Sequence, residues 1–135
     1  MNIKIALDTD VFISAFLFKG ETNNLVSLWK TGKIKILISK EVLKEYIKVL
    51  SYPKFKLSKK EITYLIEEEF LSFVEICKPK LKFDFIKDDP EDNKFLDLAY
   101  EGKVDYIISG DKHLLELKRF KKIKIVSVRE FLKLI

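Results

Sequence analysis

The sequence predicts an α/β fold of three layers, α/β/α, in which helices cover a mainly parallel central sheet. The order of the sequence patterns supports this prediction, and the absence of linkers indicates a single domain. Short runs of β-branched and other apolar residues alternate along the chain with stretches of helical periodicity. Within the 135 residues we find no repeat, linker or low-complexity segment. We therefore expect one domain that spans residues 1–135.

The first half of the chain alternates strands and helices. We expect a strand at 3–7, helices at 11–18 and 23–29, a strand at 34–38 and a helix from 39 to 50. Gly20 separates the first two helices. Ser39 has the position of an N-cap, and Pro53 stops the helix that follows it.

The second half continues the same alternation. We expect a helix at 58–73, a short strand at 74–77, a helix at 89–101, a strand at 104–108, a short helix at 112–117, a strand at 123–126 and a last helix after 127. Ser58 with Glu61, and Ser127 with Glu130, form capping-box patterns. The segment from 79 to 88 predicts no element.

Composition narrows the classes of function. The formal net charge of +5 favours polyanionic partners such as nucleic acid. With a single cysteine, Cys77, the chain has no internal disulfide, and with His113 as its one histidine it has no Cys/His zinc site. Neither a cleavable signal nor a membrane span is indicated, so we expect a cytoplasmic protein without membrane contact.

Two aspartates follow predicted strands directly. Asp8 ends the first strand, and Asp111 comes just after the strand at 104–108. Functional groups of open α/β sheets gather beyond the carboxyl ends of the strands, so both residues are candidates for a site. The alternative is that each caps the helix that follows it, which is a common role for aspartate.

Asp92 and Glu45 lie on predicted helices. Asp92 shares the apolar stripe of its helix with Leu96 and Ala99, where a carboxylate is costly unless something compensates its charge. The alternative is a capping box opened by Asp89. Glu45 lies at the border of an apolar helix face, and by itself it would be a surface residue.

These four carboxylates would together suit a hard divalent cation. Mg²⁺ and Mn²⁺ prefer oxygen ligands, and they can activate water and neutralise charge during cleavage of a phosphodiester. Asp8, Glu45, Asp92 and Asp111 are therefore our candidates for metal ligands and catalytic residues.

Several segments, in the same order, resemble the PIN-domain ribonucleases, specifically the toxin components of toxin–antitoxin systems. The similar segments are DTDVFISA at 8–15, LKEY at 43–46, DDPEDN at 88–93, YIISGDK at 106–112 and IVSVREFL at 125–132. The family usually has Asn at the position of Asp10 and often has Asp at the position of His113. No one segment is specific, but their order and spacing are.

The resemblance implies a PIN-like fold and hydrolysis of RNA by a metal-activated water. Asp8, Asp92 and Asp111 would be the main metal ligands, Glu45 would complete the shell, and Ser109 would support them. His113 would alter an accessory site or would simply lie on a helix surface. The resemblance also implies a homodimer and a separately encoded antitoxin protein as partner.

Two other interpretations remain open at this stage. A phosphatase resembling the haloacid-dehalogenase family would use Asp8 as nucleophile and Asp10 as acid and base. Against it, Val11 stands where that family usually has glycine, and no convincing catalytic lysine precedes Asp111. The third interpretation is a catalytically inactive domain that binds RNA or a protein.

Overall fold

A six-stranded, mainly parallel sheet forms the centre of the computed structural model, which describes residues 3–135. The strands are ordered β3-β2-β1-β4-β6-β5, and β5 alone runs antiparallel to its neighbour. Their bounds are β1 Ile3–Leu7, β2 Ile34–Ile38, β3 Val74–Ile76, β4 Tyr106–Ile108, β5 Arg119–Phe120 and β6 Ile123–Val126. The predicted α/β class and parallel sheet are confirmed.

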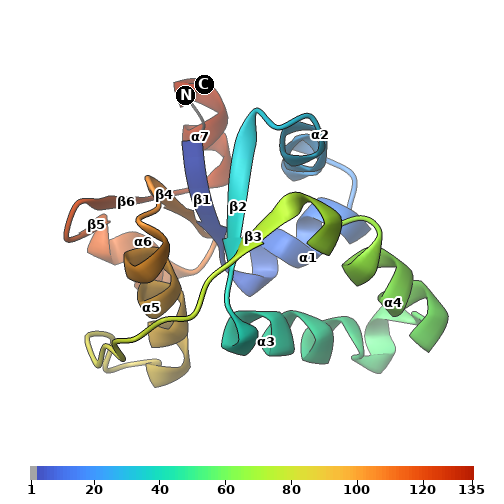
Figure 1. Ribbon diagram of the computed structural model, residues 1–135, viewed down its shortest axis with the longest axis horizontal. Coiled ribbons are helices and arrows are strands. Elements are labelled where there is room, and N and C mark those ends of the chain that lie inside the picture. Colours follow the sequence, from blue (N-terminus) through green and yellow to red (C-terminus); the bar gives the residue numbers. More distant parts are fainter. Residues whose placement is uncertain (1–2) are drawn as a thin grey trace.

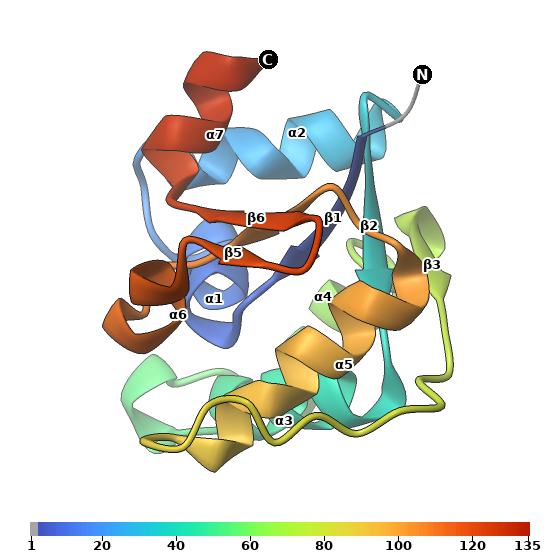
Figure 2. The same ribbon diagram turned by 90° about the vertical axis from the view of Figure 1, so that its left-hand side faces the viewer.

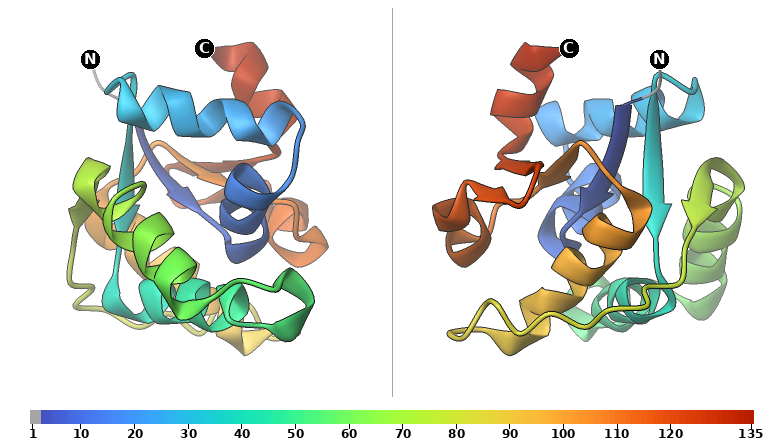
Figure 3. Two further views of the ribbon diagram at one scale, coloured as in Figure 1. Left: turned by 90° about the vertical axis from the view of Figure 1, so that its right-hand side faces the viewer. Right: turned by 60° about the vertical axis from the view of Figure 1, so that its left-hand side comes forward.

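Helices surround this sheet (Figures 1 and 2). They are α1 Thr9–Leu17, α2 Asn24–Lys30, α3 Lys40–Leu50, α4 Lys59–Glu67, α5 Asn93–Gly102, α6 Lys112–Leu117 and α7 Val128–Leu134. In Figure 1, α1 and α2 lie to one side of β1 and β2, and α5 lies to the other. Helix α3 lies below the carboxyl ends of these strands, whereas Figure 3 shows α7 beside α2 at the opposite end.

The central strands are apolar because both of their faces are covered. The side chains of Ile5, Ala6 and Leu7 in β1 are completely buried. Strand β1 pairs with β4 in a register that sets Leu7 beside Ile108. The residues that follow these two, one on each strand, are therefore neighbours at the carboxyl edge of the sheet.

A cluster of aromatic side chains joins α1 and α3 beneath that edge. The rings of Phe12 and Tyr46 are stacked with centroids 3.9 Å apart, and Phe70 meets both rings edge-on. The buried hydroxyl of Tyr46 donates a hydrogen bond of 2.5 Å to the backbone oxygen of Leu7. This contact ties the middle of α3 to the last residue of β1.

Three predicted N-caps are confirmed. The side chains of Ser39, Ser58 and Ser127 each accept a hydrogen bond from the backbone of the first helical turn, and the latter two belong to complete capping boxes. The predicted helix at 58–73 was too long. Helix α4 ends at Glu67, and a 3₁₀ turn at Leu71–Phe73 leads into β3.

Two features of the sheet were not predicted correctly. Strand β4 begins at Tyr106 rather than at 104, and the short edge strand β5 was missed. The segment from 79 to 88 has no helix or strand, and side chains of α5 hold it in place. The amide of Asn93 bonds the backbone of Phe85 and Ile86, and Asp97 Oδ1 accepts from the N–H of Phe83 at 2.7 Å.

Within residues 3–135, none of the helices has both the length and the apolar character that crossing a bilayer requires.

The substitution Tyr46→Phe tests the contact between α3 and β1. It removes the hydrogen bond to Leu7 but keeps the stacked ring, so we expect the free energy of unfolding to fall by about 1 kcal/mol. Chemical denaturation measures the change. Tyr64→Phe, at a side chain that is 56% exposed, is the control and should have no effect. Equal stability of the two variants would contradict the prediction.

Candidate active site

The four predicted acids line one small cavity of about 150 Å³. It lies where the carboxyl end of the sheet meets α3 and α5. The full lining consists of Asp8, Thr9, Asp10, Glu45, Val49, Asp92, Phe95 and Asp111. The chain therefore brings together four carboxylates that are up to a hundred residues apart in the sequence.

Asp8 is the most buried of the four, with 3% of its surface exposed. Its Oδ1 accepts from the N–H of Val11 at 2.8 Å, so it caps α1 as one interpretation expected. Its Oδ2 accepts from the Ser109 hydroxyl and from the N–H of Gly110 at 3.1 Å. Burial raises the pKa of Asp8 to about 6, although these hydrogen bonds oppose the shift.

Ser109 connects Asp8 to Asp111. The Ser109 hydroxyl, which is completely buried, donates to Asp8 and accepts from the N–H of Asp111 at 2.8 Å. Asp111 in turn caps α6, since its Oδ1 accepts from the N–H of His113 at 2.7 Å. Capping and a place in the cavity are thus compatible for both aspartates, and the two interpretations do not exclude each other.

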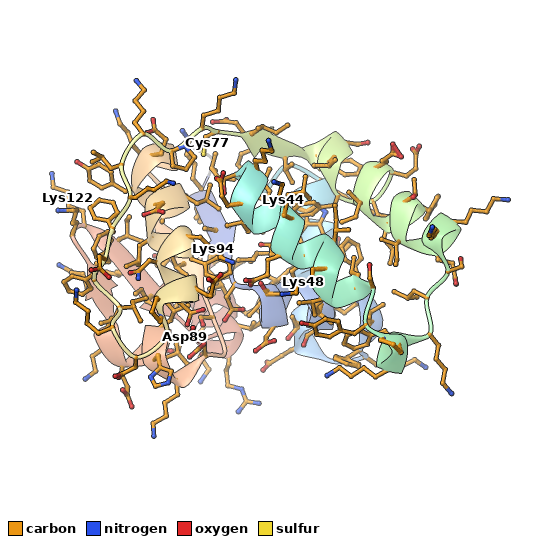
Figure 4. All side chains as sticks on the ribbon, turned by 90° about the horizontal axis from the view of Figure 1, so that it is seen from below. Lys44, Lys48, Cys77, Asp89, Lys94 and Lys122 are labelled. Carbon is orange, nitrogen blue, oxygen red and sulfur yellow. The ribbon has the colours of Figure 1, made fainter. Side chains whose placement is uncertain are left out.

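Glu45 is held by two side chains that the sequence did not single out. Thr9 Oγ1 donates to Glu45 Oε2, and the ammonium group of Lys94 lies 2.5 Å from Glu45 Oε1. Lys94 also pairs with Glu91 at 3.2 Å. Figure 4 shows Lys94 extending from α5 toward α3, whose own Lys44 and Lys48 lie on the outer side of that helix. Lys94 therefore brings a cation to the edge of an acidic cavity.

Asp92 differs from the other three acids because its buried Oδ2 atom has no hydrogen-bond partner among the described residues. Asp92 ends a short 3₁₀ helix, Pro90–Asp92, that precedes α5, and the Asp89 side chain does not cap this turn. The capping-box interpretation of Asp92 is therefore wrong. Carboxylate oxygens of Asp89, Asp92 and Asp111 all lie within 4.8 Å of one another.

Burial and the neighbouring carboxylates both raise the pKa of Asp92. Burial is the largest cause that raises this pKa to about 8, and the carboxylates of Asp111, Asp89 and Asp8 contribute in the same direction. The metal-free cluster therefore binds a proton more readily than separate, solvated carboxylates do. An orphaned buried oxygen beside two further carboxylates fits an oxygen-liganded divalent cation.

Three residues of this region were missed from the sequence. Asp89 stands directly before Pro90 in the acidic segment and was considered only as a cap, whereas Thr9 and Lys94 reach Glu45 across 36 and 49 residues of sequence. No local pattern predicts such contacts. His113 lies on the exposed side of α6, 3.9 Å from Asp88, and is not one of the clustered ligands.

A comparison with family models now identifies the fold family. Residues 4–113 match the model described as PIN domain. The chain belongs to the PIN-domain family. Proteins of this family are generally nucleases that use divalent metal ions, and the match favours that interpretation over a haloacid-dehalogenase-like phosphatase.

Comparison with individual proteins found one relative in sequence and one similar fold. An uncharacterized protein of Methanocaldococcus jannaschii, MJ1680, is 34% identical over 144 aligned positions, which cover 98% of this chain and 91% of the relative. A solved structure described as VapBC2 from Rickettsia felis bound to a DNA fragment from their promoter matches with a TM-score of 0.59 and 21% identity. That match covers 91% of this PIN domain and 97% of the other chain.

The stability of the metal-free PIN domain should fall as the pH rises. The folded-state pKa values of Asp8 and Asp92, about 6 and about 8, lie above the ordinary value of 3.8. Between pH 3.8 and about pH 8 the folded protein therefore binds more protons than the unfolded chain. The free energy of unfolding falls as the pH increases through this range.

The substitution Asp92→Asn should remove much of this dependence. In EDTA at pH 8 we expect it to raise the free energy of unfolding by about 1 kcal/mol, because solvent screens the partly exposed carboxyl group. Thermal unfolding from pH 4 to 9 measures the effect. Asp84→Asn, at a side chain that is 78% exposed, should leave the profile unchanged. A stability that rises with pH above 6 would show that these carboxyls are not the controlling groups.

Proposed function

We propose that this PIN domain is a Mg²⁺- or Mn²⁺-dependent endoribonuclease, with Asp8, Glu45, Asp92 and Asp111 as its catalytic and metal-binding residues. The observation that carries the proposal is a buried oxygen of Asp92 that has no hydrogen-bond partner within residues 3–135 and lies next to the carboxylates of Asp89 and Asp111. A carboxylate cluster of this kind is costly without a compensating positive charge. A divalent cation is the compensation that also has a chemical use.

The residues that would hold the ion are Asp92, Asp111 and Asp8, with Asp89 as an additional ligand. When bound there, a divalent ion would supply Lewis-acid polarisation of a phosphate and a bound water of lowered pKa. Ser109 and the N–H of Gly110 fix the orientation of one Asp8 oxygen, and the N–H of Val11 fixes the other. Such fixed orientation reduces the reorganisation needed during reaction.

Glu45 would complete the shell from α3. Both of its oxygens already accept hydrogen bonds, one from Thr9 and the other from Lys94. Because the Lys94 ammonium group already compensates its charge, Glu45 suits contact with the ion through a water molecule, or positioning of the attacking one, better than direct ligation. Lys94 would hold the Glu45 carboxylate pointed toward the cavity.

We propose in addition that the whole chain, residues 1–135, is one domain that acts in the cytoplasm as the toxin of a toxin–antitoxin pair. It would form a homodimer and be silenced by a separately encoded antitoxin. The support is the resemblance of the sequence motifs together with the described VapBC2 complex from Rickettsia felis, whose fold this chain shares. RNA as substrate is supported by the net charge of +5.

Cleavage of labelled single-stranded RNA by the purified protein tests the nuclease. With Mn²⁺ or Mg²⁺ we expect cleavage that disappears in EDTA and falls at least about 100-fold in Asp8→Asn, because a ligand should matter more than the groups supporting it. Asp10→Asn is the matched control. Asp10 lines the same cavity but is exposed in the first turn of α1, and we expect its substitution to be tolerated.

Three results would contradict this function in different ways. Cleavage that survives EDTA or Asp8→Asn would have another source. Hydrolysis of a small phosphate monoester that requires Asp10 would favour the phosphatase. A rise in unfolding temperature with Mn²⁺ that Asp92→Asn abolishes, without cleavage of any RNA, would favour an inactive binding domain.

A further inference from the structure

A second and larger cavity, of about 810 Å³, lies at the amino ends of β4 and β6, the opposite edge of the sheet from the carboxylates. This volume is in the range of ligand sites. In Figure 4, Lys122 lies at the left margin, away from Asp89 and Lys94. The wall of the large cavity carries four lysines and two tyrosines: Lys103, Lys121, Lys122, Lys124, Tyr100 and Tyr106.

Within residues 3–135 the lining of the cavity is net positive, because its four lysines outnumber its two acids, Glu101 and Asp105. None of its four ammonium groups lies within 4.0 Å of a carboxylate there. Its two acids are themselves engaged with backbone. Glu101 accepts from the N–H of Lys80 at 3.1 Å, and Asp105 accepts from the N–H of Lys4 at 2.9 Å. The cavity is therefore suited to an anion.

An aromatic ring is available among these lysines. Tyr100 is 42% exposed, and its ring meets Phe83 edge-on with centroids 5.3 Å apart. The ammonium of Lys121 lies 5.5 Å from the centroid of Tyr100. Proteins bind single-stranded nucleic acid with this combination of groups. The lysines contact the phosphates, and the aromatic ring stacks on a base.

The basic surface continues beyond the large cavity. Lys124 also lines a neighbouring hollow together with Lys118, Arg119, Val126 and the acid Glu130. Val126 ends β6 at the carboxyl end of the sheet, which is the end at which the carboxylates lie. We call the large cavity and this hollow together the basic face. It runs along the β5–β6 edge from one end of the sheet to the other.

Protection of an edge strand does not account for this surface. Lysines on an edge strand discourage pairing with other chains, but Lys103 and Lys121 lie outside the strands. Both have left-handed backbone, with φ of 51° and 55°, a conformation that favours glycine. Lysine at these two positions therefore replaces the residue that the backbone would prefer.

We propose that the basic face binds the single-stranded RNA that flanks the bond to be cut. The choice of RNA as ligand rests on the proposed nuclease function. The large cavity would hold one base against Tyr100 and its phosphates on the surrounding lysines. The strand would then follow Lys124, Arg119 and Lys118 toward the carboxylate cavity.

The left-handed lysines allow a test at positions where the backbone favours glycine. Lys121→Gly removes a charge but relieves the backbone, and Lys56→Gly does the same in the connection between α3 and α4, with φ of 53°. Figure 1 shows this connection at the opposite side of the molecule from β5 and β6. Lys121→Gly also removes an ammonium group that lies within 5.6 Å of the ring centroids of Phe83, Tyr100 and Phe120, so binding is compared at a temperature at which both variants remain folded.

Binding is measured in EDTA by fluorescence anisotropy of a labelled single-stranded RNA longer than about 16 nucleotides. We expect Lys121→Gly to weaken binding several-fold and to reduce the slope of log affinity against log salt by about 0.7, as loss of one phosphate contact requires. Lys56→Gly should change neither. Tyr100→Leu should weaken binding by roughly tenfold with little change in the salt slope.

Equal RNA affinities of Lys121→Gly and Lys56→Gly would overturn the proposal. It would also be overturned if duplex RNA competed for the protein as strongly as single-stranded RNA does. Because EDTA prevents metal-dependent cleavage, the binding result is separate from the nuclease assay. A protein that binds RNA through Lys121 but never cuts it would refute the proposed function and leave the basic face standing. If the protein cuts RNA and Lys121→Gly binds it with unchanged affinity, the proposed function stands and the proposed role of the basic face is refuted.

Discussion

The compensation of carboxylate charge is the constraint on which the arrangement of this molecule depends. Several acids share a cavity of about 150 Å³, and different groups compensate the charge of each. Asp8 is held by two backbone N–H groups and a hydroxyl, and Glu45 by a lysine and a threonine. Asp92 has a buried oxygen with no partner among the described residues. The incomplete compensation at Asp92 is what points to a bound cation rather than to a purely structural network.

The sheet makes this arrangement possible. The pairing of Leu7 with Ile108 sets Asp8 beside Ser109, and the N–H of Asp8 donates to the backbone oxygen of Ile108. A register shift of one residue would turn the side chains of β1 to opposite faces and separate these groups. The apolar packing of β1 therefore determines the position of a polar side chain at its end. Tyr46 adds a second restraint, because it ties the helix that carries Glu45 to the same strand.

Features determined by neighbouring residues were predictable from the sequence, whereas long-range contacts were not. The apolar runs gave the central strands, and Ser39, Ser58 and Ser127 marked helix starts, because capping acts within one turn. Asp8 and Asp111 were predicted to lie together because parallel strands end at one edge, whereas Asp92 was singled out by the apolar stripe of its helix and Glu45 only in company with the other three. The two-residue strand β5 carries no periodicity. Lys94 could not be predicted as a partner of Glu45, since only the packing of α5 against α3 brings them together.

The two surfaces of opposite charge complement each other energetically. An acidic cavity repels a phosphodiester until cations neutralise it, so affinity for RNA has to come from contacts elsewhere. Lysines on the basic face would hold the strand equally in the ground state and in the transition state. Such uniform binding lowers KM and leaves kcat unchanged. In the proposed reaction the carboxylates, by contrast, would act where charge develops, and their substitution would lower kcat. This division would allow a chain with a net charge of +5 to keep its reactive centre acidic.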